Sequence, residues 1–135
     1  MVAPTVLDAS AVVDFIRDAA ESRAVLDLVA DESCDIFVPH LCDLEVLSAL
    51  RTRVRRSEVE PQHAKEALDL YEAMPLKRVG HLPLLDRAFA LRDNFSAYDA
   101  AYVALAEAIG ARLVTADMRL AAAVRRFTEI EVVDA

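Results

Sequence analysis

Thr5-Val6-Leu7-Asp8-Ala9-Ser10 is a short apolar run that ends in an acid and, two residues later, a serine. The apolar part has the length and composition of a buried β-strand. Asp8-Ala9-Ser10 is typical of the beginning of a helix, and Ser10 is its expected cap. A strand that leads directly into a helix favours an α/β fold, here with an acid at the carboxyl end of the first strand.

The same alternation recurs along the rest of the chain. Further strands are expected at 36–38, 76–79, 112–114 and 130–133, the last at an edge, and helices at 10–17, 20–30, 41–55, 61–73, 82–92, 96–109 and 117–126. This pattern predicts a mainly parallel sheet of about five strands flanked by helices on both faces. Pro61 suits the first turn of the helix at 61–73, and Gly110 is expected to end the helix at 96–109 in a left-handed conformation. We predict one three-layer α/β domain over residues 1–135.

The composition supports one packed domain. The chain has 135 residues, 56% of them hydrophobic, and only two glycines, which leaves no room for a flexible linker. No apolar run approaches the roughly 18 residues of a membrane span, and Met1-Val2-Ala3-Pro4 lacks the features of a signal peptide. Cys34 and Cys42 do not have the pattern of a zinc site and are expected to be reduced thiols. We expect a cytoplasmic protein without membrane contact.

The net charge of −8 argues against a general nucleic-acid coating protein, which would present broad basic faces. It does not exclude a nuclease, because metal ions reverse the local charge of a carboxylate-lined site. The positive charge is uneven, since Arg51, Arg53, Arg55 and Arg56 fall within six residues. This cluster fits either a phosphate-contacting stretch or the solvated end of a helix, where cations suit the macrodipole. The sequence leaves both readings open.

Four acids, Asp8, Glu45, Asp99 and Asp117, interrupt apolar segments that are far apart in the chain. Asp8 and Asp117 follow expected strands, at the edge where parallel α/β sheets bind ligands. Asp99 begins the helix that leads into the strand before Asp117, and Glu45 faces the core side of its own helix. Isolated carboxylates on apolar segments are costly to bury unless something pairs with them. We therefore expect the four to converge on one pocket.

Convergence of four carboxylates requires counter-charge. Two unit charges about 4 Å apart repel by roughly 4 kcal/mol at an effective dielectric near 20, so the site must take up protons or cations. Oxygen ligands without cysteine or histidine favour Mg²⁺ or Mn²⁺ over zinc. Such ions activate water and stabilise a leaving oxygen in phosphodiester hydrolysis, with no need of a histidine base or serine nucleophile. A metal-dependent hydrolase is therefore the leading hypothesis.

Each acid also has a simpler explanation. Asp8 and Asp117 can cap the helices that follow them. Asp99 can serve its own helix through the dipole, and Glu45 can pair with Arg51. Jointly, these explanations require four independent coincidences. The remaining acids considered are expected to be solvated or capping: Asp14, Asp35, Asp43, Asp93 and Asp134.

Four segments in order carry a family resemblance: Leu7-Asp8-Ala9-Ser10-Ala11, Asp43-Leu44-Glu45-Val46, the stretch 96–106, and Leu113-Val114-Thr115-Ala116-Asp117. Together they resemble the PIN-domain ribonucleases. The length and the order match the VapC toxins of bacterial toxin–antitoxin pairs, and the resemblance covers essentially the whole chain. One mild departure is Ala100-Ala101 after Asp99, where the family often has a larger second residue.

The resemblance implies a Mg²⁺- or Mn²⁺-dependent endoribonuclease in which metal-activated water attacks an RNA phosphodiester, leaving 5′-phosphate and 3′-hydroxyl ends. Its catalytic, metal-binding quartet matches Asp8, Glu45, Asp99 and Asp117. Ser10 and Thr115 match its hydroxyl positions, which orient carboxylates or water. The resemblance also implies a homodimer, and a small VapB-like antitoxin whose C-terminal segment covers the site.

Other functions fit the residues less well. A receiver domain needs paired acids after the first strand and a late lysine, but the only lysines are Lys65 and Lys77. A haloacid-dehalogenase-like domain needs a second aspartate where this chain has Ser10. The rival of another class is a non-catalytic or weakly active interaction module that binds an antitoxin or RNA. The intact quartet counts against it, and an RNA cleavage assay with and without Mg²⁺ would separate the two.

Overall fold

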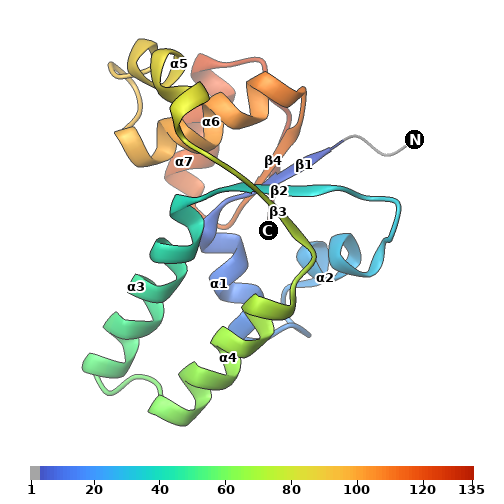
Figure 1. Ribbon diagram of the computed structural model, residues 1–135, viewed down its shortest axis with the longest axis vertical. Helices are drawn as coiled ribbons and strands as arrows, with labels where there is room; N and C mark the ends of the chain where they lie inside the picture. The colour runs from blue at the N-terminus through green and yellow to red at the C-terminus, as the bar shows by residue number, and fades with distance from the viewer. Residues whose placement is uncertain (1–3) are drawn as a thin grey trace.

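The computed structural model describes residues 4–135 and has a five-stranded sheet between two layers of helices (Figure 1). The strands lie in the order β3-β2-β1-β4-β5, and every neighbouring pair is parallel. Their bounds are β1 (Thr5–Leu7), β2 (Ile36–Pro39), β3 (Leu76–Val79), β4 (Arg112–Thr115) and β5 (Val132–Asp134). The predicted three-layer α/β fold with a parallel sheet is confirmed, and β5 is an edge strand as expected.

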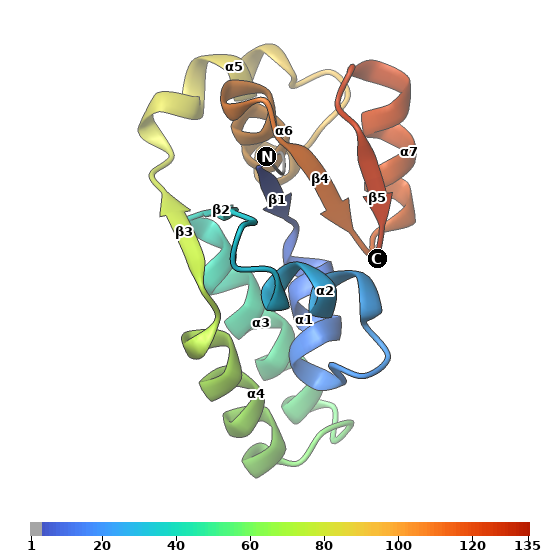
Figure 2. The ribbon, with the colours of Figure 1, turned by 90° about the vertical axis from the view of Figure 1, so that its right-hand side faces the viewer.

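The helices divide between the two faces in chain order. One layer holds α1 (Ala9–Arg17), α2 (Arg23–Ala30), α3 (Leu41–Arg55) and α4 (Pro61–Ala73). The other holds α5 (Leu85–Ala90), α6 (Ala97–Ile109) and α7 (Met118–Phe127), with the short 3₁₀ turn η1 (Leu82–Leu84) before α5. Figure 2 shows the first group below the strands, α5 and α6 above them, and α7 beside β5. The α3–α4 pair extends well beyond the strands (Figure 2).

The most apolar helix is also the most central one. Residues 100–106 of α6 are all buried, and the helix packs across β1, β2 and β4. A helix that is apolar on nearly every side must lie inside a fold, which explains its place over the middle of the sheet. Tyr102, in the middle of α6, is only 1% exposed. The hydroxyl of this tyrosine therefore needs a partner inside the protein.

The strand order reverses between β1 and β4, which are direct neighbours. Leu7 pairs with Val114, and the amide of Asp8 donates to the carbonyl of Val114 at 2.9 Å. The residues that follow the two strands therefore emerge side by side at the carboxyl edge of the sheet. Open α/β sheets bind their ligands at this kind of switch point.

Several element boundaries differ from those expected. The helix expected at 82–92 is a 3₁₀ turn followed by a helix that ends at Ala90; Pro83 lies in this 3₁₀ turn, which closes with an amide–carbonyl bond from Leu84 to His81. The last strand begins at Val132 because the Thr128 hydroxyl accepts the amide of Ile130 in a local turn. Gly110 adopts the left-handed conformation, with φ of 64°, as predicted.

Both cysteines are free thiols. Within residues 4–135, the helices are all too short or too polar to cross a bilayer.

Candidate active site

Asp8 lies directly after β1 and is 6% exposed. Its Oδ2 atom accepts hydrogen bonds from the hydroxyls of Ser10 and of Thr115, the latter at 2.9 Å. A hydroxyl has a single hydrogen, and both hydroxyls donate theirs to this one oxygen. Across the described chain, Oδ1 receives no such bond from the protein, which leaves it as the oxygen of Asp8 that can bind a ligand.

The backbone after β4 completes this arrangement. The amide of Ala116 donates to Ser10 Oγ at 3.1 Å, and the amide of Asp117 donates to Thr115 Oγ1 at 3.0 Å. Thr115 itself is fully buried. Asp8, Ser10, Thr115 and Asp117 thus form one hydrogen-bonded unit at the ends of β1 and β4, which we name the strand half of the site.

Two expectations about helix caps change here. Ser10 does not cap α1, because Asp8 occupies the cap position and the Ser10 side chain turns back to Asp8 and to the segment after β4. Asp8 itself makes no capping bond through its side chain. Asp117 does cap α7, since its Oδ1 accepts the amides of Arg119 and Leu120 at 2.9 and 3.1 Å. Capping therefore accounts for one oxygen of Asp117 but for neither oxygen of Asp8.

The other two acids come from helices and, with Tyr102, form the helix half of the site. Glu45 projects from α3, and its Oε1 accepts a hydrogen bond from the Tyr102 hydroxyl at 2.8 Å. Asp99 lies in the first turn of α6, where its amide donates to the hydroxyl of Ser96 at 3.1 Å. Ser96 thereby caps α6 through its side chain. In the part of the chain that is described, Glu45 forms no ion pair with Arg51.

The charges of the four acids act on one another. Burial raises the pKa of Asp99, and the nearby carboxylates of Asp8 and Asp117 raise it further. Burial also raises the pKa of Glu45; the Tyr102 hydrogen bond opposes this, while the charges of Asp8 and Asp99 add to it. Each member of the quartet is therefore close enough to feel at least one other. The structure brings all four acids to the carboxyl edge of the sheet.

The four acids provide oxygen donors but do not form a closed cage. Within residues 4–135, no three His, Cys, Asp or Glu side chains are gathered tightly enough to hold an ion unaided. Mg²⁺ usually keeps several of its waters and takes one or two carboxylates directly, so it does not need a closed cage of protein ligands. Burial raises the pKa of Glu45 and of Asp99, and neighbouring carboxylates add to the rise; a divalent cation would favour the charged form of both. The donor set therefore fits Mg²⁺ or Mn²⁺.

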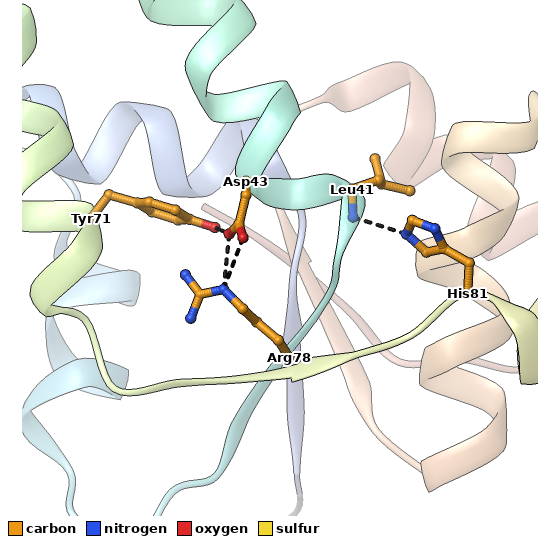
Figure 3. A network of polar contacts seen from close by, with 5 residues as sticks. All are labelled: Leu41, Asp43, Tyr71, Arg78 and His81. Carbon is orange, nitrogen blue, oxygen red and sulfur yellow. Dashed lines mark hydrogen bonds and ion pairs between the residues drawn. The ribbon is translucent and has the colours of Figure 1, made fainter.

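A polar network anchors the start of α3, the helix that bears Glu45 (Figure 3). Both carboxylate oxygens of Asp43 accept Arg78 Nε, at 2.9 and 3.2 Å, and Asp43 also accepts the hydroxyl of Tyr71. The amide of Leu41 donates to Nε2 of His81 at 2.9 Å. These contacts join the first turn of α3 to α4, to β3 and to the loop after β3. Asp43, expected to be solvated or capping, is a structural acid and stands outside the quartet.

Sequence reasoning did not assign Tyr102 to the site. The available signal was its position three residues after Asp99, which puts both on one face of α6. The partners of Asp43 were beyond reach, because Tyr71 and Arg78 lie 28 and 35 residues away. Tyr98, on the same helix, has 66% of its surface exposed.

The fold and the site define an α/β domain with four acids at the edge of the sheet where the strand order reverses. A family model described as PIN domain matches residues 5–125. The chain belongs to the PIN domain family, and the similar curated proteins carry the name VapC.

Ribonuclease VapC1 of Mycobacterium tuberculosis is 42% identical over 129 residues, which cover 95% of this chain and 96% of that protein. Ribonuclease VapC9 of the same species is 39% identical over 115 residues, or 85% and 87% of the two chains. Among solved structures, VapBC2 from Rickettsia felis bound to a promoter DNA fragment has a TM-score of 0.71 at 16% identity, covering 97% and 98% of the chains. DNA-bound VapBC from Salmonella typhimurium has 0.68 at 14%, covering 98% of each. These two structures show the same fold.

Proposed function

We propose that this protein is a Mg²⁺- or Mn²⁺-dependent endoribonuclease, the toxin of a VapC-type toxin–antitoxin pair. The observation that carries the proposal is the convergence of four mutually repelling carboxylates at the switch point of the sheet. Membership in the PIN domain family and relatives named ribonucleases supply the substrate class.

Each residue of the quartet has a proposed task. Asp8 and Asp117 would hold the principal ion, with Glu45 and Asp99 completing the site. A divalent ion here supplies a water of lowered pKa and stabilises the charge that develops on the leaving oxygen. Ser10 and Thr115 fix Oδ2 of Asp8, which leaves Oδ1 to bind the ion. No histidine base or serine nucleophile is required.

The binding partners and the cellular location of the protein are also proposed. Likeness to proteins named VapC supports a small VapB-like antitoxin as the inhibitor, and we propose a homodimer as the working unit. Two free thiols suit the reducing cytoplasm, where we place the protein.

The decisive experiment is RNA cleavage by purified protein freed of any partner. We expect cleavage of a mixed RNA pool with Mg²⁺ or Mn²⁺, its loss in a chelator, and its return when the ion is restored. An Asp8→Asn protein purified in parallel controls for contaminating nucleases. Tight binding of an antitoxin without any cleavage would instead identify a non-catalytic interaction module.

A further inference from the structure

An open groove of about 400 Å³ begins at Glu45 and follows α3 away from the carboxylates. Its floor carries Ser48 and Thr52, and its far end is lined by Arg53 and Arg56. Residues 45, 48, 52 and 56 recur at helical spacing and therefore share one face of α3. The groove and the quartet share one residue, Glu45.

The two arginines in this groove are not neutralised by an ion pair within the described residues. Arg53 and Arg56 form no ion pair anywhere in residues 4–135, whereas Arg78 and Arg87 each pair with an acid. The only acid in the groove besides Glu45 is Glu58. Arg51, Arg55 and several other arginines of the described chain also form no ion pair, so what sets Arg53 and Arg56 apart is that they line the groove. A guanidinium offers a planar fork of donors that matches a phosphate.

We propose that this groove binds RNA phosphates that flank the one being cleaved, with Arg53 and Arg56 as their contacts. This inference rests on the proposed function. Arg53 follows Glu45 by eight residues, about 12 Å along a helix, so we assign it to a neighbouring phosphate and not to the one held at the carboxylates. Ser48 and Thr52 offer hydroxyl donors between the two positions. The groove therefore sets the path of the strand and contributes affinity without taking part in the chemistry.

The same helix supplies a matched control. Arg51 and Arg55 line a different hollow, with apolar neighbours such as Leu47 and Val54, that does not include Glu45. They carry the same charge near the same helix end. Removing either pair changes the net charge and the helix-dipole interaction by similar amounts. Only the position of the charge relative to the groove differs.

The binding test uses Asp99→Asn protein, so that RNA is not consumed, and a short fluorescent single-stranded RNA of random sequence. We expect R53Q/R56Q to make the dependence of log affinity on log salt shallower by about 1.4, for two lost phosphate contacts. R51Q/R55Q should leave this slope nearly unchanged. R53K/R56K should restore most of the slope, because lysine keeps the charge.

Cleavage by proteins with an intact quartet provides the second readout. R53Q/R56Q should raise KM about tenfold with kcat retained, as expected when only uniform binding is lost. Equal weakening by both glutamine pairs would reveal a general charge effect and overturn the proposal. No change with either pair would also overturn it, and would leave the groove to another occupant such as an acidic protein segment. Metal-dependent cleavage by the parent protein would survive both outcomes, so the proposed function is judged separately.

Discussion

The strand half and the helix half of the site are built differently. In the strand half, Asp8 and Asp117 each lie within two residues of a strand end, and the register of β1 with β4 determines how they meet. Two hydroxyls and two backbone amides lock the unit together. In the helix half, Glu45 and Asp99 depend on two helices that pack from opposite faces of the sheet. One tyrosine hydroxyl connects these helices at the site.

The strand half is preorganised by hydrogen bonds, whereas the carboxyl groups of the helix half respond to the charges around them. The pKa of Glu45 and of Asp99 is raised by burial and by neighbouring carboxylates, so their charged forms need a counter-ion. Oδ2 of Asp8 has two hydroxyl donors, and Oδ1 of Asp117 has two amide donors, before any ion arrives. We infer that the strand half presents a ready position for a cation, and that binding relieves repulsion mainly in the helix half.

The largest expected effect comes from removing one charge in either half. Asp8→Asn and Asp99→Asn should each lower cleavage by more than about 100-fold, beyond the range typical of residues that only orient a ligand. Asp93→Asn, an exposed acid next to α6, is the matched control and should cleave normally. Circular dichroism should show an unchanged fold in all three. Wild-type turnover by Asp99→Asn under Mg²⁺ would remove that residue from the quartet.

The sequence predicted the sheet, its parallel character and the seven main helices because each element carries its own signal. The apolar runs that became β1 and β4 end in acids, and Gly110 marks the end of α6 through a conformation that few other residues adopt. Boundaries were less accurate where a single side chain decides them. Thr128, for example, delays β5 through one hydrogen bond that no periodicity reveals.

The residues of the candidate site were also predictable from local signals, but their orientations were not. Asp8 and Asp117 follow strands, so the switch-point rule places them together. The direction in which Ser10 turns depends on the amide of Ala116, which is 106 residues away and is brought near only by the pairing of β1 with β4. Tyr102 lies among apolar residues in the sequence, and only the fold, which brings one residue of α6 and one of α3 together at the edge of the sheet, gives its hydroxyl a carboxylate. Local sequence specifies which residues are available; tertiary contacts decide how they are oriented.

A smaller effect tests how the strand half is held. Thr115→Val keeps the shape of a fully buried side chain but removes a hydrogen bond to Asp8 and leaves the amide of Asp117 without its acceptor. We expect cleavage and Mn²⁺ affinity to fall about 10–100-fold. Thr5→Val is the control, because Thr5 is equally buried in β1 and bonds to Arg112 and Cys34 instead. Similar losses of activity in both variants would mean that Thr115 acts through general stability alone.

The helix half has its own test in Tyr102→Phe, which deletes the hydroxyl that holds Glu45. Because Glu45 is partly exposed, water can replace the lost donor, and the cost to stability should stay below about 1.5 kcal/mol. Mn²⁺ affinity, measured by calorimetry, should fall about tenfold, at the lower end for an outer-shell partner. Tyr98→Phe, at an exposed position on the same helix, should have no effect. An unchanged Mn²⁺ affinity in Tyr102→Phe would show that Glu45 needs no positioning.

The smallest effect concerns stability and tests whether charge repulsion accumulates in the helix half. The raised pKa of Glu45 means that the folded protein binds its proton more tightly than the unfolded chain, so stability is lost as pH rises from the ordinary pKa of glutamate through the folded value. At neutral pH the full cost is present, and solvent screening of this half-buried group limits it to about 1 kcal/mol. Glu45→Gln, without added metal, should therefore melt about 2–4 °C higher than wild type at pH 7.

The difference between Glu45→Gln and wild type should disappear below about pH 4, where the wild-type side chain is protonated. Mn²⁺ should reverse the order at pH 7, because the wild type has one more carboxylate for the ion and more repulsion to relieve. Calorimetric melting with and without Mn²⁺ measures both effects. If wild type and Glu45→Gln melt at the same temperature at pH 7 in a chelator, the charged Glu45 carboxylate does not destabilise the folded protein. The two halves would then differ in architecture but not in energy.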